Sequence, residues 1–312
     1  MTYEDALGAL AGSREDVVVL TAENRAPIRN LPSALGERFV DVGICEETLV
    51  GAAAGLALRG RTPVVHALAA FLTMRAFEFV RTDVGLGRLP VKLVGYVPGF
   101  LSEANGPTHQ ALEDVALMRG IPGMQVFCPA DEMELVQALP VLCDDRSPCY
   151  IRYNAGPARA PHTRPFAIGE AEVLGEGNVV TILTYGLLVR EALKAQEHLD
   201  SQGVATRVVN LRMLKPIDER VLLESAHDSQ MVVTLEDHFL VGGLRSIVAE
   251  LFVRQGLVRP LLPIALEERW FRPALLDDVL EHEGFEGGMI AKRILRALES
   301  PPKRGERAWP MV

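Results

Sequence analysis

The pattern of apolar and polar positions divides the first half of the chain into short strands and amphipathic helices. Helices are predicted between apolar, β-branched runs, among them a small-residue helix over 47–58 and one that starts after Asp131. The runs themselves predict buried strands at residues 17–22, 39–44, 62–68, 91–97, 124–130 and 148–153. Such alternation is typical of a parallel sheet covered by helices on both faces, so we predict a doubly wound α/β domain.

The same pattern restarts after a segment that has no periodicity. Residues 156–168 are rich in proline and arginine and are predicted to form a linker. Beyond them, apolar runs at 179–186, 204–211 and 231–238 alternate with helical stretches. We therefore predict an α/β protein of two domains, 1–155 and 169–300, each a doubly wound, mainly parallel sheet, followed by a tail at 301–312.

The composition narrows the classes of function. A net charge of -9, with a pI near 5.4 and no basic stripe, argues against a nucleic-acid or anionic-membrane partner. No apolar run approaches the length of a membrane span, and the acidic N-terminus does not resemble a signal peptide. We expect no metal site on this chain and a reducing, cytoplasmic setting, because the cysteines lack ligand spacing: Cys45, Cys128, Cys143 and Cys149.

Glu46 is the first candidate for chemistry. It lies at a predicted strand end, before a helix with small residues on one face: Gly51, Ala52, Ala54 and Gly55. A helix N-terminus favours a carboxylate by less than about 1 kcal/mol, so simple capping by Glu46 and Glu47 is one interpretation. The small-residue face permits close approach of another backbone or subunit, which an isolated cap would not need. Both interpretations stay open on the residues alone.

Two further candidates are an aromatic helix and a loop. Phe71, Met74 and Phe77 recur at i, i+3 and i+6, a spacing that suits a core stripe as well as the wall of a ligand site. The loop NGPTHQ, residues 105–110, follows the strand at 91–97, and ligands of open α/β sheets bind at the carboxyl ends of strands. A Gly-Pro turn fixes His109 there, although a histidine in a loop is often merely solvated.

Together these features resemble the pyrimidine domain of the transketolase family, which includes deoxyxylulose-phosphate synthases. The shared order is a strand-end glutamate that opens a small-residue helix, then an aromatic-rich helix, then GPTHQ. The family's glutamate precedes a helix glycine by nine positions, as Glu46 precedes Gly55, and this selects Glu46 over Glu47. The similarity covers nearly the whole chain and continues in the second domain through TYG, LRMLKPID and TLEDHFLVGGLRSIVAELF.

The resemblance implies thiamine diphosphate as the cofactor. Glu46 would hydrogen-bond the ring nitrogen of the aminopyrimidine and favour the imino tautomer, whose exocyclic nitrogen removes the thiazolium proton. Phe71, Met74 and Phe77 would form an apolar wall around the ring, with at least one aromatic side chain stacked on it. Met74 stands where the family often has an aromatic residue, so its contact would be softer.

The resemblance also implies transfer of a two-carbon ketol unit from a ketose or ketose phosphate to an aldose. His109 would donate to the substrate oxygen on which charge develops, with Gln110 in support. Arg152 would bind a substrate phosphate, and its alternative is an ion pair with any nearby carboxylate. Asn105 replaces an aspartate that holds a donor hydroxyl in the family, and Val97 replaces a second histidine. The usual sugar-phosphate specificity therefore does not follow.

A partner subunit is expected as well. A complete transketolase carries a preceding domain whose GDG motif and later asparagine hold Mg²⁺ and the diphosphate, and neither is found in this sequence. We therefore predict the C-terminal subunit of a split transketolase, with Mg²⁺ held by a diphosphate-binding N-terminal subunit. The expected assembly is a dimer of heterodimers.

Three alternatives stay open. The β subunit of a 2-oxoacid dehydrogenase shares both domains and the glutamate but lacks GPTHQ. A fragment of a deoxyxylulose-phosphate synthase is close in local sequence, although that enzyme is one longer chain. A non-catalytic scaffold would keep the fold and the interface, yet it would not need Glu46, His109 and the apolar wall together.

Overall fold

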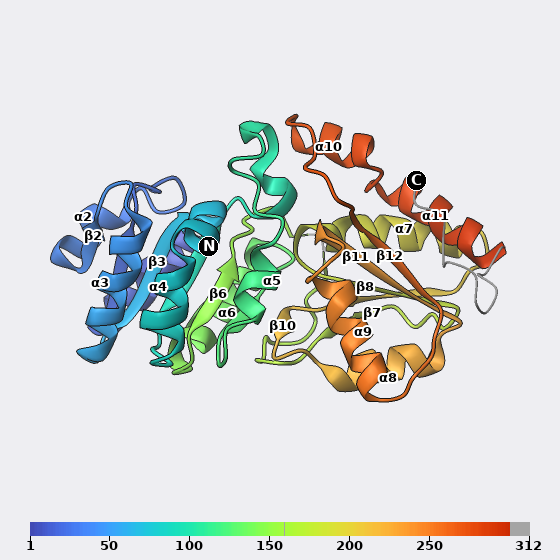
Figure 1. The fold of residues 1–312 in the computed structure, drawn as a ribbon, viewed down its shortest axis with the longest axis horizontal. Helices are drawn as coiled ribbons and strands as arrows, with labels where there is room; N and C mark the ends of the chain where they lie inside the picture. Colours follow the sequence, from blue (N-terminus) through green and yellow to red (C-terminus); the bar gives the residue numbers. More distant parts are fainter. Residues whose placement is uncertain (159, 300–312) are drawn as a thin grey trace.

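Two α/β units lie side by side in the computed structural model, which describes residues 1–158 and 160–299 (Figure 1). The predicted tail at 301–312 lies outside the described residues. Among the helices of the described part, none combines the length and apolarity that crossing a bilayer would require.

A seven-stranded sheet forms the core of the first unit. Its strand order is β10-β5-β6-β4-β3-β1-β2, and every pairing is parallel except that of β10 with β5. Most apolar runs are buried because helices cover both faces, as the fully buried β1 illustrates. The predicted buried strand at 39–44 is wrong in part, because the edge strand β2 is shorter and half-buried and Ile44 is 70% exposed. The strands are β1 (Val17–Thr21), β2 (Phe39–Asp41), β3 (Thr62–Leu68), β4 (Lys92–Tyr96), β5 (Gln125–Phe127), β6 (Cys149–Arg152) and β10 (Met213–Lys215).

Two helices of the first unit, α3 and α6, begin close to where the sequence predicts them. Asp131 caps α6, accepting a hydrogen bond from the Glu134 backbone N–H at 3.1 Å. The α-helices are α1 (Tyr3–Ser13), α2 (Leu31–Leu35), α3 (Glu46–Leu58), α4 (Phe77–Phe79), α5 (Asp114–Arg119) and α6 (Glu132–Asp144). Two short 3₁₀ segments, η1 (Gly36–Arg38) and η4 (Gly99–Asn105), complete the unit together with two π-helical segments, η2 (Phe71–Arg75) and η3 (Val80–Gly85).

The prediction of one regular helix through the aromatic stretch is wrong. The segment from Phe71 onward consists of η2, the short α4 and η3, and the Ala76 N–H donates to the Phe71 carbonyl, five residues back, at 3.1 Å. A π-helical turn rotates later residues away from the face that α-helical spacing predicts. Residues at i, i+3 and i+6 therefore do not share one face here.

The second unit contains a five-stranded sheet of order β12-β11-β8-β9-β7. It is parallel except for β7, which pairs antiparallel with β9. The strands are β7 (Glu172–Leu174), β8 (Val180–Thr184), β9 (Thr206–Asn210), β11 (Met231–Phe239) and β12 (Leu261–Leu266). The helices are η5 (Gly186–Leu188), α7 (Val189–Ser201), α8 (Glu219–Asp228), α9 (Leu244–Arg254), α10 (Leu276–Glu283) and α11 (Gly287–Glu299). The predicted fold class, two mainly parallel α/β sheets, is confirmed.

One strand links the two units in a way that the sequence did not reveal. β10 follows β9 of the second sheet in the chain, yet it pairs antiparallel with β5 at the edge of the first sheet, with Met213 opposite Phe127. In Figure 1 it lies between the two units. The later part of the chain therefore completes the sheet of the earlier part.

Candidate active site

Glu46 is the first residue of α3, and its side chain is buried. Only 3% of that side chain is exposed, whereas the neighbouring Glu47 is half-buried. Its Oε2 accepts a hydrogen bond from Nη1 of Arg75 at 2.7 Å. The N-terminus of α3 also favours negative charge at this position. The glutamate that the nine-residue spacing selects is thus the one that faces into the protein.

Arg75 is a residue that sequence reasoning missed. It ends the π-helical segment η2, its side chain is 41% exposed, and its guanidinium carbon lies 4.1 Å from the centroid of the Phe71 ring. A cation at this distance from an aromatic face is attracted by the ring. The sequence did contain a clue to Arg75. A buried glutamate needs a cation, and Arg75 stands four residues after Phe71 in a largely apolar stretch.

Phe71 connects this ion pair to the predicted histidine loop. The Phe71 and His109 rings meet edge to face, with 5.0 Å between centroids and an interplanar angle of 62°. The Nδ1 atom of His109 lies 2.9 Å from the Thr108 hydroxyl oxygen. A continuous series of contacts therefore runs from Glu46 through Arg75 and Phe71 to His109.

The predicted apolar wall is divided in the structure. Phe71 and Met74 pack against a small cluster of alanines: Ala69, Ala70 and Ala111. Phe77 packs instead against the larger core of the sheet. The π-helical turn between them is the physical reason, and the structure does not bring Phe77 to the side chains with which it was predicted to act.

The histidine loop is anchored in the second unit. Phe100, in η4, is buried between Phe271 and Phe285, at centroid distances of 5.3 and 4.8 Å. Gln110 is also buried, and its Nε2 donates to the Phe271 carbonyl at 2.9 Å. Gln110 thus fastens the histidine loop to the second unit, and its amide is not presented at the surface. Packing of the second unit positions His109, which the first unit carries.

Two predicted departures from the family pattern lie in the same loop. Val97, directly after β4, has a φ of 51°, a left-handed conformation that a β-branched side chain rarely adopts. Asn105 is exposed at the end of η4, and the series of contacts from Glu46 to His109 does not include it. Both departures therefore lie on the segment that leads from β4 to His109.

Arg152 does not lie where its predicted role requires. Its guanidinium is buried between two carboxylates, with Nε 2.8 Å from Asp114 Oδ2 and Nη1 2.7 Å from Asp237 Oδ1. It also lies over the Tyr185 ring, 5.3 Å from the centroid. Both acceptors neutralise its charge away from solvent, which argues against the predicted phosphate contact. Arg152 instead joins α5 of the first unit to β11 of the second.

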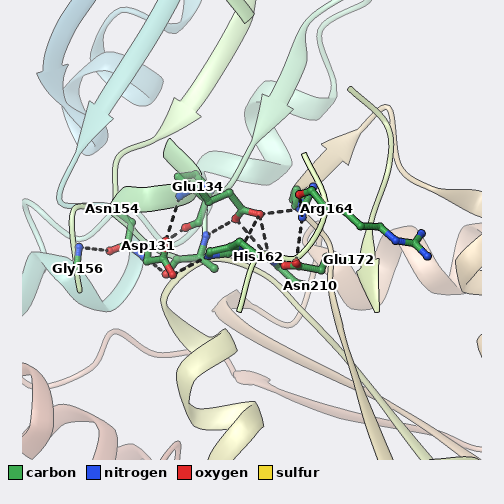
Figure 2. A network of polar contacts seen from close by, with 11 residues as sticks. Asp131, Glu134, Asn154, Gly156, His162, Arg164, Glu172 and Asn210 are labelled. Atoms are coloured by element: carbon green, nitrogen blue, oxygen red, sulfur yellow. Dashed lines mark hydrogen bonds and ion pairs between the residues drawn. The ribbon is translucent and has the colours of Figure 1, made fainter. Parts of the chain in front are cut away.

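A second charged cluster surrounds His162, between the two units (Figure 2). The ring lies 2.8 Å from Asp131 through Nε2 and 3.1 Å from Glu172 through Nδ1. Burial opposes a charged ring, but these two hydrogen bonds raise the pKa of His162 to about 10. Arg212 adds a second cation, with Nε 2.8 Å from Glu134 and Nη2 3.2 Å from Glu172.

This His162 cluster is closed rather than open. Ligand-type atoms of Glu134, His162 and Glu172 lie within 4.8 Å of one another, which resembles a metal site. Arg212, with 2% of its side chain exposed, already supplies positive charge to both carboxylates. The cluster is therefore enclosed by the protein, although Arg212 Nε and Glu172 Oε1 meet their ion-pair partners without hydrogen-bond geometry.

Comparison with known proteins identifies the family. Residues 1–159 match the family described as transketolase, pyrimidine binding domain, and residues 169–289 match transketolase, C-terminal domain. The chain belongs to the transketolase family. The family resemblance predicted from GPTHQ and the spaced glutamate is therefore confirmed, and this chain contains the pyrimidine-binding and C-terminal domains of a transketolase.

Individual relatives match it almost end to end. The 6-deoxy-6-sulfo-D-fructose transketolase subunit SqwH of a Clostridium species is 37% identical, covering 97% of this chain and 94% of that protein. A Methanocaldococcus jannaschii protein, provisionally named a transketolase C-terminal section, is 33% identical over 95% of each. A split-gene transketolase solved as an inactive β4 tetramer superposes with a TM-score of 0.86 at 34% identity, covering 95% and 97%.

The transketolase family depends on thiamine diphosphate, and the described site fits the pyrimidine end of that cofactor. The buried Glu46 carboxylate pairs with Arg75, whose guanidinium lies over the partly exposed Phe71 ring, and His109 contacts the same ring. An aminopyrimidine needs such a combination, because one edge must hydrogen-bond a carboxylate while its faces contact apolar groups.

Proposed function

We propose that this chain is the C-terminal subunit of a two-component, thiamine-diphosphate-dependent transketolase. It would transfer a two-carbon ketol unit from a ketose donor to an aldose acceptor. A separate diphosphate-binding subunit would hold Mg²⁺ and the diphosphate, and the assembly would be a dimer of heterodimers located in the cytoplasm. The near-complete coverage of separate-chain relatives supports a split enzyme.

The single observation that carries the proposal is the environment of Glu46. Its carboxylate is buried at the start of α3 and faces the series of contacts that ends at His109. A structural glutamate of a scaffold would not need a cation that also lies over an aromatic ring in contact with a histidine. This grouping favours the catalytic interpretation over simple helix capping.

Each residue has a defined task in this proposal. Glu46 would hold a proton at the ring nitrogen of the aminopyrimidine, while Phe71 and Met74 orient the ring and exclude water from it. His109 would donate to the substrate oxygen that gains negative charge, and Asn105, exposed four residues earlier, would contact a donor hydroxyl. When bound, thiamine diphosphate supplies the carbon nucleophile that the reaction needs.

The donor we propose is a ketose with an anionic group at its far end. One relative is named for 6-deoxy-6-sulfo-D-fructose, in which a sulfonate stands where a sugar phosphate would carry its phosphate. Arg152 is occupied by Asp114 and Asp237, so another cation, on this chain or its partner, would hold that group. Ketose phosphates and the sulfonated ketose are therefore the donors to compare.

Reconstitution tests the proposal. The purified chain is mixed with its proposed diphosphate-binding subunit, thiamine diphosphate and Mg²⁺, and ketol transfer from each donor to an aldose is followed. We expect activity from the mixture and none from either chain alone. Activity of this chain by itself would refute the split enzyme.

The same mixture separates the alternatives. Oxidative turnover of a 2-oxoacid in place of ketol transfer would identify a 2-oxoacid dehydrogenase component. A complex that assembles but turns over neither substrate class would favour a non-catalytic scaffold. The relatives named above are transketolases, which favours ketol transfer over both alternatives.

A further inference from the structure

Arg75 makes two contacts that a bound aminopyrimidine would also need. Its Nη1 donates to Glu46 Oε2 at 2.7 Å, and its guanidinium carbon lies 4.1 Å from the centroid of the Phe71 ring. Glu46 is the residue proposed to hold the pyrimidine ring nitrogen, and Phe71 is the aromatic side chain proposed to orient the ring. One arginine therefore occupies both partners at once.

The guanidinium and the protonated aminopyrimidine are chemically alike. Each is planar, delocalised and cationic, and each presents N–H donors along one edge and a flat face above and below. A carboxylate accepts from the edge, and an aromatic ring stacks against the face. The site around Glu46 is thus filled by a group of the shape and charge that it is proposed to recognise.

We infer that Arg75 is a placeholder: it occupies the seat of the aminopyrimidine in the cofactor-free chain and leaves that seat when the cofactor enters. This inference rests on the proposed function. The exposure of the Arg75 side chain, 41%, gives the guanidinium a route to solvent, whereas Glu46 at 3% has none. The mobile partner of the pair is therefore the arginine.

A placeholder has two opposing effects. It compensates the buried negative charge of Glu46 before the cofactor arrives, and an uncompensated buried carboxylate would be destabilising. It also competes with the cofactor, because only molecules in which Arg75 has left are competent to bind. The measured affinity for thiamine diphosphate is then lower than the intrinsic affinity of the open seat.

The test is calorimetric titration of thiamine diphosphate, with Mg²⁺, into the reconstituted complex of this chain and its diphosphate-binding subunit. Arg75→Met keeps an apolar stem and removes the competing charge. We expect its dissociation constant to fall about two- to fivefold, the range for a partly exposed ion pair. Arg75→Lys keeps the charge without the planar face, and we expect a value between those of the wild type and Arg75→Met.

Arg81→Met is the matched control, because Arg81 is an exposed arginine in the next π-helical segment. We expect no change in its dissociation constant. Thermal unfolding of the cofactor-free chains supplies a second readout, in which Arg75→Met, but not Arg81→Met, lowers the midpoint because Glu46 loses its cation. An unchanged affinity of Arg75→Met for the cofactor would overturn the placeholder inference. A weaker affinity would also overturn it and would identify Arg75 as a contact of the bound cofactor.

Failure of this inference is distinguishable from failure of the proposed function. A wild-type complex that binds no thiamine diphosphate would refute both. A wild-type complex that binds it, with an affinity that Arg75→Met does not improve, would leave the transketolase proposal intact and remove only the placeholder.

Discussion

Two clusters of charge in this chain each pair a buried glutamate with an arginine, yet they differ in what surrounds them. Glu46 has one identified cation, Arg75, whose side chain is 41% exposed beside an aromatic ring. Glu134 meets Arg212 with 1% and 2% of their side chains exposed, inside the His162 cluster. The first pair lies at an open surface, and the second is enclosed between the two units.

This difference separates a candidate ligand site, at Glu46, from a structural contact between the two units, at the His162 cluster. In the His162 cluster, three acids meet two cations of the chain itself, and at most 2% of each of these side chains is exposed, so a ligand has no access to them. At Glu46 the compensating charge can move away and leave a carboxylate beside an apolar surface. Buried charge alone therefore does not mark a catalytic centre. A buried charge whose partner can be exchanged does.

The largest difference between the two clusters is expected when the Glu46 carboxylate is removed. Glu46→Ala should lower kcat of the reconstituted complex by about 10²–10⁴-fold, the range for loss of a positioned proton-transfer group. Steady-state ketol transfer measures this, with circular dichroism to verify the fold. The matched control is Glu47→Ala, which should change kcat little. Equal losses in both variants would reduce Glu46 to a helix cap.

Removing the cation of the closed cluster should affect folding instead of chemistry. Arg212→Met leaves Glu134 and Glu172 without their shared guanidinium, and breaking a buried ion pair in this way costs about 3–5 kcal/mol of unfolding free energy. Urea unfolding of the chain measures the loss. Arg220→Met, at a fully exposed ion pair with Glu224, is the control and should have no measurable effect. Wild-type stability of Arg212→Met would contradict the structural role proposed for the His162 cluster.

The smallest effect is a pH dependence that belongs to the closed cluster. His162 faces Asp131, Glu134 and Glu172, and Arg212 pairs with the two glutamates. Its folded pKa of about 10 lies above its ordinary value of 6.5, so the folded state binds the proton more tightly than the unfolded state. The stabilisation is fully present below pH 6.5 and is lost as pH rises towards 10.

His162→Gln should remove that contribution, about 1–3 kcal/mol near neutral pH, and flatten the fall in Tm between pH 6.5 and 10. Differential scanning calorimetry of both proteins across this range measures the change. A parallel fall in wild type and variant would mean that another group, such as buried Glu236 with its pKa raised to about 8 by burial, dominates the profile.

Much of the fold was predictable because parallel strands that are buried on both faces must be nearly continuous apolar runs. The predicted runs at 17–22, 62–68 and 91–97 contain β1, β3 and β4, and the nine-residue spacing from Glu46 to Gly55 selected the glutamate that is buried. The assignment of catalytic roles to Glu46 and His109 stays a prediction until turnover is measured.

The remaining features depend on information that local sequence does not carry. Apolar spacing cannot distinguish an α-helix from one interrupted by π-helical turns, so Phe77 was grouped with Phe71 and Arg75 was overlooked. The partners of Arg152 come from residues 114 and 237, which no local pattern relates to it. β10 has three residues, and only its tertiary neighbour makes it a strand.

The position of β10 has a consequence for synthesis of the chain. The edge of β5 stays uncovered until Met213–Lys215 has left the ribosome, although the other strands of that sheet have emerged well before. An exposed strand edge is a template for pairing with another chain. If residues 1–155 were expressed alone, the edge of β5 would stay uncovered. We therefore expect a protein divided at its linker to aggregate.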